Sequence, residues 1–277
     1  MINKIGFMQG RLSPLVDGKI QAFPWKSWQQ EFPKAQVLDL GLMEWTLDQE
    51  RLYENPLMNT AGQREIHSLC KSHQISIPSL TGDCFMQAPF WKADGEMKDM
   101  LKADFIAIAR SCSEVSIQMI VVPLVDNGRL ENQQQEEALL TFMLAQGDLF
   151  RALGLRIIFE CDFLPDRLTH FINQLPADIF GVNYDIGNSA ALGYKPEEEF
   201  FGYGDRILNV HIKDRILGGT TVSLGSGNAD FPKIFRLLKE VGYQGNLIMQ
   251  TARASDGDHV GVLREYMDQI KVWAGEI

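Results

Sequence analysis

The sequence has few cysteines and no long hydrophobic segment. Its four cysteines, Cys70, Cys84, Cys112 and Cys161, show no paired C-x-x-C spacing, which argues against a disulfide framework and a zinc knuckle. No segment approaches the ~18 consecutive apolar residues of a membrane-spanning helix. The opening residues MINKIGFMQGRLSP lack the apolar core of a signal peptide. We therefore expect a cytoplasmic protein with reduced thiols.

Positive charge is also scarce. The chain has 26 Lys and Arg residues against 36 Asp and Glu residues, a net charge of −10. Such an excess of negative charge repels the phosphate backbone of nucleic acids and anionic lipid surfaces. We therefore expect a small-molecule partner, with neither nucleic acid nor membrane as a partner. The sequence leaves a homo-oligomer open.

The chain contains no Pro/Ser-rich linker, block of like charge or low-complexity segment that would divide it. Its 277 residues, 45% of them hydrophobic, are close to the roughly 250 residues of a single α/β barrel domain. We therefore predict one domain that spans residues 1–277.

Short apolar runs alternate with longer segments in which apolar residues recur at helical spacing. The runs predict eight strands, at residues 4–9, 35–44, 75–81, 117–124, 155–161, 178–185, 207–213 and 245–251. The predicted helices include residues 59–74, 95–115, 132–154, 230–242 and 258–277. Eight alternating units favour an α/β fold of the (β/α)8 TIM-barrel type over an open sheet, which typically has five or six strands.

Four polar residues stand at the C-terminal ends of successive predicted strands: Glu160, Asp185, His211 and Gln250. In a barrel, such strand ends point into one small space. Two carboxylates and one imidazole suit an open site for one divalent ion, Mn²⁺, Mg²⁺, Co²⁺ or Zn²⁺. Taken singly, Glu160 also fits an ion-paired loop residue, Asp185 a turn residue and His211 a satisfied core histidine. Their recurrence on neighbouring strands favours the metal site.

Further polar residues follow the first, second and seventh predicted strands. Gln9 and Arg11 follow the first, and Glu44 ends the second, where it fits a second general base, a substrate-hydroxyl acceptor or a structural partner of Arg11. Gly225 and Gly227 precede a helix and could present amides to an anion, with Lys213 and Arg215 as local positive charges. A lone G-x-G is a weak signal, however, and a plain turn explains these glycines better. We also expect Phe85, Phe90 and Trp91 to line a pocket or lid in the loop after the third strand.

The segments GFMQGRLSP, FECDF, YDIGN and VHIKDR, with the Gly-rich loop and the last strand, resemble the xylose isomerase-like TIM-barrel superfamily of sugar and sugar-phosphate isomerases and epimerases. The resemblance covers essentially the whole chain. It implies a metal-binding set of Glu, Asp, His and Glu, with the two glutamates as an acid/base pair. On this basis Glu160 is a ligand and base, and Arg215 contacts the substrate.

Two positions depart from the pattern of this superfamily. Gln250 stands where the second glutamate is expected; its amide oxygen can ligate a hard cation but cannot transfer a proton. Asn188 stands where related epimerases often carry a histidine that orients the substrate. Both departures weigh against a two-base mechanism.

Three functions fit these residues. The first is a metal-dependent isomerase or epimerase of a small keto-sugar or sugar phosphate, in which the ion favours enediolate formation while a carboxylate removes a proton. The second is a dehydratase or lyase that uses one carboxylate base. The third is a non-catalytic sugar-binding protein. The predicted catalytic residues are Glu160 and Glu44; the predicted metal ligands are Glu160, Asp185, His211 and Gln250; and the predicted substrate contacts are Gln9, Arg11, Asn188, Lys213 and Arg215.

Overall fold

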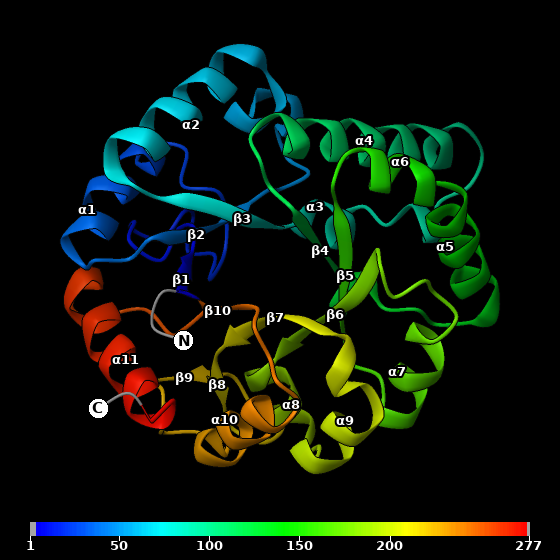
Figure 1. The fold of residues 1–277 in the computed structure, drawn as a ribbon. Coiled ribbons are helices and arrows are strands. Elements are labelled where there is room, and N and C mark those ends of the chain that lie inside the picture. Colours follow the sequence, from blue (N-terminus) through cyan, green and yellow to red (C-terminus); the bar gives the residue numbers. More distant parts are fainter. Residues whose placement is uncertain (1–3, 276–277) are drawn as a thin grey trace.

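A computed structural model describes residues 4–275 of the chain. Eight parallel strands form a closed barrel in the order β1-β10-β7-β6-β5-β4-β3-β2, with helices around it (Figure 1). The strands are β1 Ile5–Met8, β2 Leu42–Thr46, β3 Ser76–Thr81, β4 Met119–Leu124, β5 Arg156–Cys161, β6 Phe180–Asp185, β7 Ile207–Ile212 and β10 Asn246–Met249. The predicted (β/α)8 TIM-barrel fold is confirmed.

The α-helices form the outer layer of the molecule, apart from short ones near the strand ends (Figure 1). They are α1 Glu31–Val37, α2 Thr60–His73, α3 Asp83–Gln87, α4 Gly95–Glu114, α5 Gln133–Ala145, α6 Gly147–Ala152, α7 Pro165–Ile172, α8 Ile186–Leu192, α9 Pro196–Tyr203, α10 Phe231–Glu240 and α11 His259–Trp273. None of the described helices combines the length and the apolar character that crossing a membrane would require.

Two predicted elements have different limits in the structure. Residues 35–37 of the predicted second strand belong to helix α1, because Phe32 and Ala35 bury one helical face; β2 begins only at Leu42. The helix predicted at residues 132–154 is two helices, and the second begins at Gly147, a residue type that weakens helix continuity. The last two residues of the helix predicted at 258–277 lie outside the described residues.

Local signals mark the ends of two helices, α6 and α10, and the start of α10. Gly154 and Gly242 have φ values of +68° and +69°, which a residue without a Cβ adopts readily after a helix. Asp230 caps α10 by accepting a hydrogen bond from the Lys233 amide. These caps fix the length of the helices and so the places where the loops begin.

The hydrophobic core lies mainly between the barrel and the surrounding helices. Its aromatic part includes Phe105 and Phe150, which pack against each other with ring centroids 5.9 Å apart. Phe85, Phe90 and Trp91 belong to this core and are at most 6% exposed. The expectation that they line a lid is therefore wrong, because Phe85 and Phe90 pack on Phe105 of α4.

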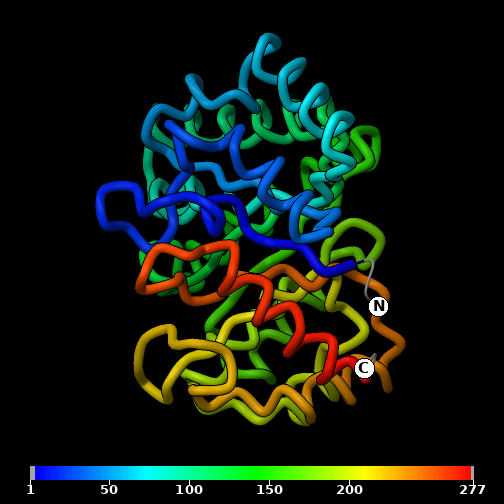
Figure 2. Tube along the Cα trace, turned by 90° about the vertical axis from the view of Figure 1, so that its left-hand side faces the viewer, coloured from blue at the N-terminus to red at the C-terminus, as the bar shows by residue number. Residues whose placement is uncertain are grey.

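Several long loops extend from one end of the barrel, where the strands finish. Figure 2 shows the segments around residues 10–22, 214–230 and 250–258 on its left side. The loop after β7 contains a two-stranded antiparallel sheet of β8, Asp214–Arg215, and β9, Thr221–Val222. This end of the barrel carries the polar strand-end residues.

Candidate metal centre

Three buried side chains converge where β5, β6 and β7 end. Glu160, Asp185 and His211 lie on these neighbouring strands, and Asp185 is the register partner of His211. His211 Nδ1 is 3.1 Å from Glu160 Oε2 and 3.9 Å from Asp185 Oδ2. One ligand atom from each residue lies within 4.8 Å of the others, so the trio is compact enough to hold one cation.

A hydrogen bond with Glu44 sets the orientation of His211. His211 Nε2 donates to Glu44 Oε1 at 2.7 Å. A carboxylate only accepts, so the Nε2 atom carries the hydrogen and Nδ1 is the nitrogen turned toward Glu160 and Asp185. Burial disfavours the charged imidazolium, but Glu44 and Glu160 outweigh it and raise the pKa of His211 to about 10. A cation that binds Nδ1 therefore competes with a proton.

Glu44 lies inside the barrel and is fully buried. Besides His211, it accepts hydrogen bonds from Ser79 Oγ at 2.6 Å, from Thr81 Oγ1 and from Asn209 Nδ2 at 3.0 Å. Burial alone would raise the pKa of Glu44, but the charge and hydrogen bond of His211 lower it. Its partners are thus His211 and the barrel interior, and the alternative of an ion pair with Arg11 is not found.

Both oxygens of Glu160 are held by side-chain amides. Asn183 Nδ2 donates to Oε2 at 2.9 Å, and Asn188 Nδ2 donates to Oε1 at 2.8 Å. Asn188 Oδ1 in turn accepts from Arg215 Nη1 at 2.8 Å. Burial opposes ionisation, yet His211 and Lys213 lower the pKa of Glu160. The site therefore keeps Glu160 as a carboxylate with both oxygens oriented.

Asp185 has two roles at the start of α8. Its Oδ1 accepts from the backbone amide of Asn188 at 2.8 Å and so caps the helix. Its Oδ2 lies 2.7 Å from Lys213 Nζ. Burial raises the pKa of Asp185, and Lys213 offsets part of that rise.

Gln250 follows β10 and is bound by its neighbours. Its Oε1 accepts from Lys213 Nζ at 2.9 Å, and its Nε2 donates to Gln21 Oε1 at 2.9 Å. Lys213 therefore links Gln250 to Asp185 of the trio. Lys213 itself lies between Asp185 and Gln250 and is 12% exposed.

The two candidates that follow β1 form hydrogen bonds with residues outside the trio. Gln9 is fully buried, and its Oε1 accepts from the Thr46 amide at 3.1 Å. Arg11 donates to the Ile20 carbonyl at 2.9 Å and to Gln21 Oε1 at 3.4 Å. Gln21 links this part of the rim to Gln250.

Some residues of the site are not among those that the sequence singled out. Asn183 and Asn209 stand two positions before Asp185 and His211, and alternate strand residues share a face, so the pattern could have found them. Asn209 donates to Asn183 Oδ1 at 2.8 Å, and Asn183 in turn donates to Glu160 of the trio. Gln21 lies in a loop, and no local pattern marks it.

The Gly-rich loop after β7 does not offer free amides to an anion. Gly225 N and Gly227 N donate to Asp214 Oδ2 at 2.9 and 2.8 Å, and Ala229 N donates to Asp214 Oδ1 at 3.2 Å. The amides considered for an anion are therefore bound by a carboxylate of the chain itself. The plain turn that the sequence favoured describes the loop.

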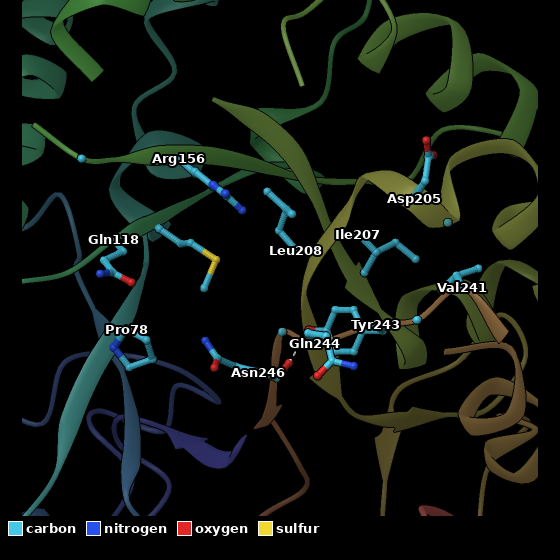
Figure 3. Close-up of a pocket in the computed structure, with 15 residues that line it drawn as sticks. Pro78, Gln118, Arg156, Asp205, Ile207, Leu208, Val241, Tyr243, Gln244 and Asn246 are labelled. Carbon is cyan, nitrogen blue, oxygen red and sulfur yellow. Dashed lines mark hydrogen bonds between the residues drawn. The ribbon is translucent and has the colours of Figure 1, made fainter. Parts of the chain in front are cut away.

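A cavity of about 590 Å³ lies at the other end of the barrel. It is lined by residues near the beginnings of β3, β4, β5, β7 and β10, among them Gln118, Arg156, Tyr243 and Asn246 (Figure 3). Tyr243 Oη donates to the Asn246 carbonyl at 2.6 Å. None of the predicted site residues lines this cavity, so its volume does not locate the polar cluster.

The family model described as "Xylose isomerase-like TIM barrel" matches residues 33–272. A putative L-ribulose-5-phosphate 3-epimerase from Haemophilus influenzae is 23% identical over 81% of this chain and 83% of its own. An inosose dehydratase from Geobacillus kaustophilus is 30% identical over 48% of this chain, and the match spans only 52% of the dehydratase. A match to an uncharacterized Methanocaldococcus jannaschii protein, 26% identical over 38% of this chain, spans 37% of that protein.

Solved structures share the fold over nearly the full length. A D-psicose 3-epimerase, determined with D-fructose, superposes with a TM-score of 0.76 at 13% identity, over 98% of this chain and 99% of the other. A xylose isomerase-like TIM-barrel protein from Mycobacterium smegmatis, in complex with magnesium, has a TM-score of 0.71 at 17% identity, over 99% and 97% of the two chains. Since the family model covers most of the sequence, the chain belongs to the xylose isomerase-like TIM-barrel family.

Proposed function

We propose that the protein is a metal-dependent isomerase or epimerase of a small keto-sugar or sugar phosphate. The observation that carries the proposal is the buried trio of Glu160, Asp185 and His211, with ligand atoms within 4.8 Å of one another. The sugar epimerases among its relatives support the choice of substrate class.

The donor set fits one divalent ion. Two carboxylates and the Nδ1 atom of an imidazole suit Mn²⁺, Mg²⁺, Co²⁺ or Zn²⁺. The bond from His211 to Glu44 is the outer-sphere carboxylate contact that typically orients a ligating histidine. When bound, such an ion polarises the carbonyl and hydroxyl oxygens of a sugar and makes the neighbouring C–H bond more acidic.

Glu160 is the residue best placed to move the proton. It is a buried carboxylate in the trio, and its lowered pKa keeps it ready to accept a proton at neutral pH. The Asn183 and Asn188 amides hold its two oxygens in place. We assign Glu160 both roles, ligand and base, because the residue directly after β10 is the amide Gln250 and not a second carboxylate.

The remaining candidates bind or orient the substrate in this proposal. Asn188 and Arg215 form one hydrogen-bonded pair beside Glu160, suited to the hydroxyl groups of a sugar. Lys213 balances the charge of Asp185, and Gln250 contributes an amide oxygen at the rim. Gln9 remains a proposed substrate contact, with its Nε2 buried and without a hydrogen-bond partner among residues 4–275.

The structure favours a role for Glu44 other than the catalytic one predicted from the sequence. Its carboxylate is fully buried and already accepts four hydrogen bonds, so a substrate would have to displace His211 to reach it. We therefore propose that Glu44 positions His211 and that it is not a second base.

A dehydratase or lyase is the second candidate, and Gln250 is the observation that favours it. An amide at this position leaves one carboxylate base, which suffices to remove a proton in an elimination. A relative named inosose dehydratase agrees with this alternative.

The test combines metal analysis with isotope exchange. Purified protein is assayed for bound Mn, Mg, Co and Zn, then incubated in D₂O with a panel of ketoses and ketose phosphates and followed by NMR. We expect a bound divalent ion and deuterium on the carbon next to a carbonyl. Net loss of water would favour the dehydratase, whereas no metal and no exchange across the panel would refute both enzymes.

A further inference from the structure

Two arginines lie together at the rim of the barrel, outside the metal trio. Arg11 follows β1 and Arg253 follows β10, and these strands pair in the barrel. Arg11 Nη1 donates to the Ile20 carbonyl at 2.9 Å, and Arg253 Nε donates to the same carbonyl at 3.4 Å. The two guanidinium groups therefore meet at one oxygen atom.

Donor groups of this pair remain unused. Arg11 is 5% exposed, and its Nε atom is buried without a hydrogen-bond partner among the described residues. Arg253 uses Nη1 for the Ser13 carbonyl at 2.6 Å, while its Nη2 lies beside Gly10. Gly10 has a φ of +93°, and a Cβ there would lie 3.2 Å from the Ala22 carbonyl and 3.4 Å from Nη2, so a side chain at this position would press on the guanidinium.

The nearby carboxylates do not fully compensate the two positive charges. Burial and the charge of Arg253 lower the pKa of Arg11 to about 9, so the pair is under like-charge repulsion. Burial raises the pKa of both Asp83 and Glu31 to about 7. Glu31 already accepts from the Gly10 and Leu12 amides, and Asp83 accepts from Gln21. An additional anion would relieve the repulsion.

A short chain of side chains connects the arginine pair to the trio. Gln21 Oε1 accepts from Arg11 Nη2 at 3.4 Å and from Gln250 Nε2 at 2.9 Å. Gln250 and Lys213 then continue to Asp185. The loops after the last strands are also where TIM barrels frequently bind phosphate. The arginine pair and the trio thus belong to one connected network of side chains.

The geometry points to an oxyanion subsite at Arg11 and Arg253, which takes the phosphate ester or carboxylate of the substrate. The inference rests on the proposed function, because it places one end of that substrate. Guanidinium groups present planar pairs of donors that match both kinds of oxyanion. The cations gather here although the chain carries a net charge of −10, so they are a local feature.

Calorimetric titration of the full chain with inorganic phosphate, and separately with acetate, tests the subsite without turnover. We expect saturable binding of one of them and a loss of about tenfold or more in Arg253→Gln. Arg253→Lys should bind with intermediate strength, since it keeps the charge and loses the fork. Arg236→Gln is the control, because Arg236 is an exposed residue of α10 paired with Glu240.

The two anions separate the two possible substrate groups. Preferential binding of phosphate supports a phosphate ester, and preferential binding of acetate supports a carboxylate. No saturable binding of either anion, or equal losses in Arg253→Gln and Arg236→Gln with unchanged melting temperatures, would overturn the subsite. Deuterium exchange on an uncharged ketose without anion binding would leave the proposed function standing and remove only this inference.

Discussion

The two sides of the strand-end site use equivalent positions differently. On the side of β5, β6 and β7, Glu160, Asp185 and His211 turn toward one another. On the side of β10 and β1, Gln250 is bound by Lys213 and Gln21. A polar residue at a strand end therefore joins the trio or links neighbouring side chains according to the partners that it contacts.

Replacement of Glu160, which belongs to the trio at the ends of β5, β6 and β7, should give the largest effect on activity. Glu160→Gln keeps the shape of the side chain and removes the proton acceptor, so we expect isotope exchange to slow by about 10²- to 10⁴-fold. The measurement is deuterium incorporation by NMR, with the melting temperature recorded in parallel. Glu197→Gln is the control, since Glu197 lies on α9 and pairs with Lys233 at the surface. Exchange within tenfold of the parent rate would contradict the assignment.

On the side of β10 and β1, the pH dependence of stability should show the contribution of Glu31, which binds the segment after β1. Glu31 is fully buried, and burial raises its pKa from the ordinary 4.5 to about 7. The folded state therefore binds more protons than the unfolded state between these values, and the stability contributed by this group falls as pH rises. Relative to Glu31→Gln, which does not titrate, we expect a loss of about 3 kcal/mol between pH 4.5 and pH 7.

Urea unfolding of the parent and of Glu31→Gln at pH 4, 5, 6, 7 and 8 measures this difference. The variant is expected to be less stable at low pH, because its amide nitrogen cannot accept from the Gly10 and Leu12 amides. A difference in the free energy of unfolding that is independent of pH would show that Glu31 keeps an ordinary pKa.

Loss of the Glu44 carboxylate should weaken the first side without touching a proposed ligand. Glu44→Gln removes the charge that orients His211, and outer-sphere partners of this kind contribute about 10- to 100-fold to metal affinity. Titration with Mn²⁺ at one fixed pH measures the loss. Glu54→Gln serves as the matched control, because Glu54 is exposed and pairs with Arg51. Equal affinity in the two variants would mean that His211 does not depend on Glu44.

The fold was predictable because periodicity and strand-end chemistry are local. The eight apolar runs gave the barrel, and alternation within β6 and β7 could also have placed Asn183 and Asn209 on the inner face. The partner of Glu44 was not predictable, since the contact joins residues 167 positions apart, and the sequence offered Arg11 instead. The contact of Gln21 with Gln250 was not predictable for the same reason, because these residues are 229 positions apart.

The Gly-rich loop shows that a valid local signal can have a nonlocal outcome. Two glycines before a helix do present amides, as the sequence suggested, but the chain supplies its own anion, Asp214. Arg253 carried no local signal and lies in a loop, yet it is the residue that meets Arg11 at Ile20. Loops decide these contacts, and their paths are set by packing across the whole rim.

Gln250→Glu should make the second side resemble the first, with the smallest of the four effects. The new carboxylate would accept from Lys213 and add one negative charge beside Asp185, so we expect divalent metal to bind about tenfold more tightly. Gln250→Met, which supplies no hard oxygen ligand, is the matched control. Equal metal affinity in the parent, Gln250→Glu and Gln250→Met would show that the side chain at position 250 does not contribute to metal binding. Because a glutamate there can also transfer a proton, a gain of exchange at a second carbon of the same ketose would identify this amide as the feature that limits the parent protein to one base.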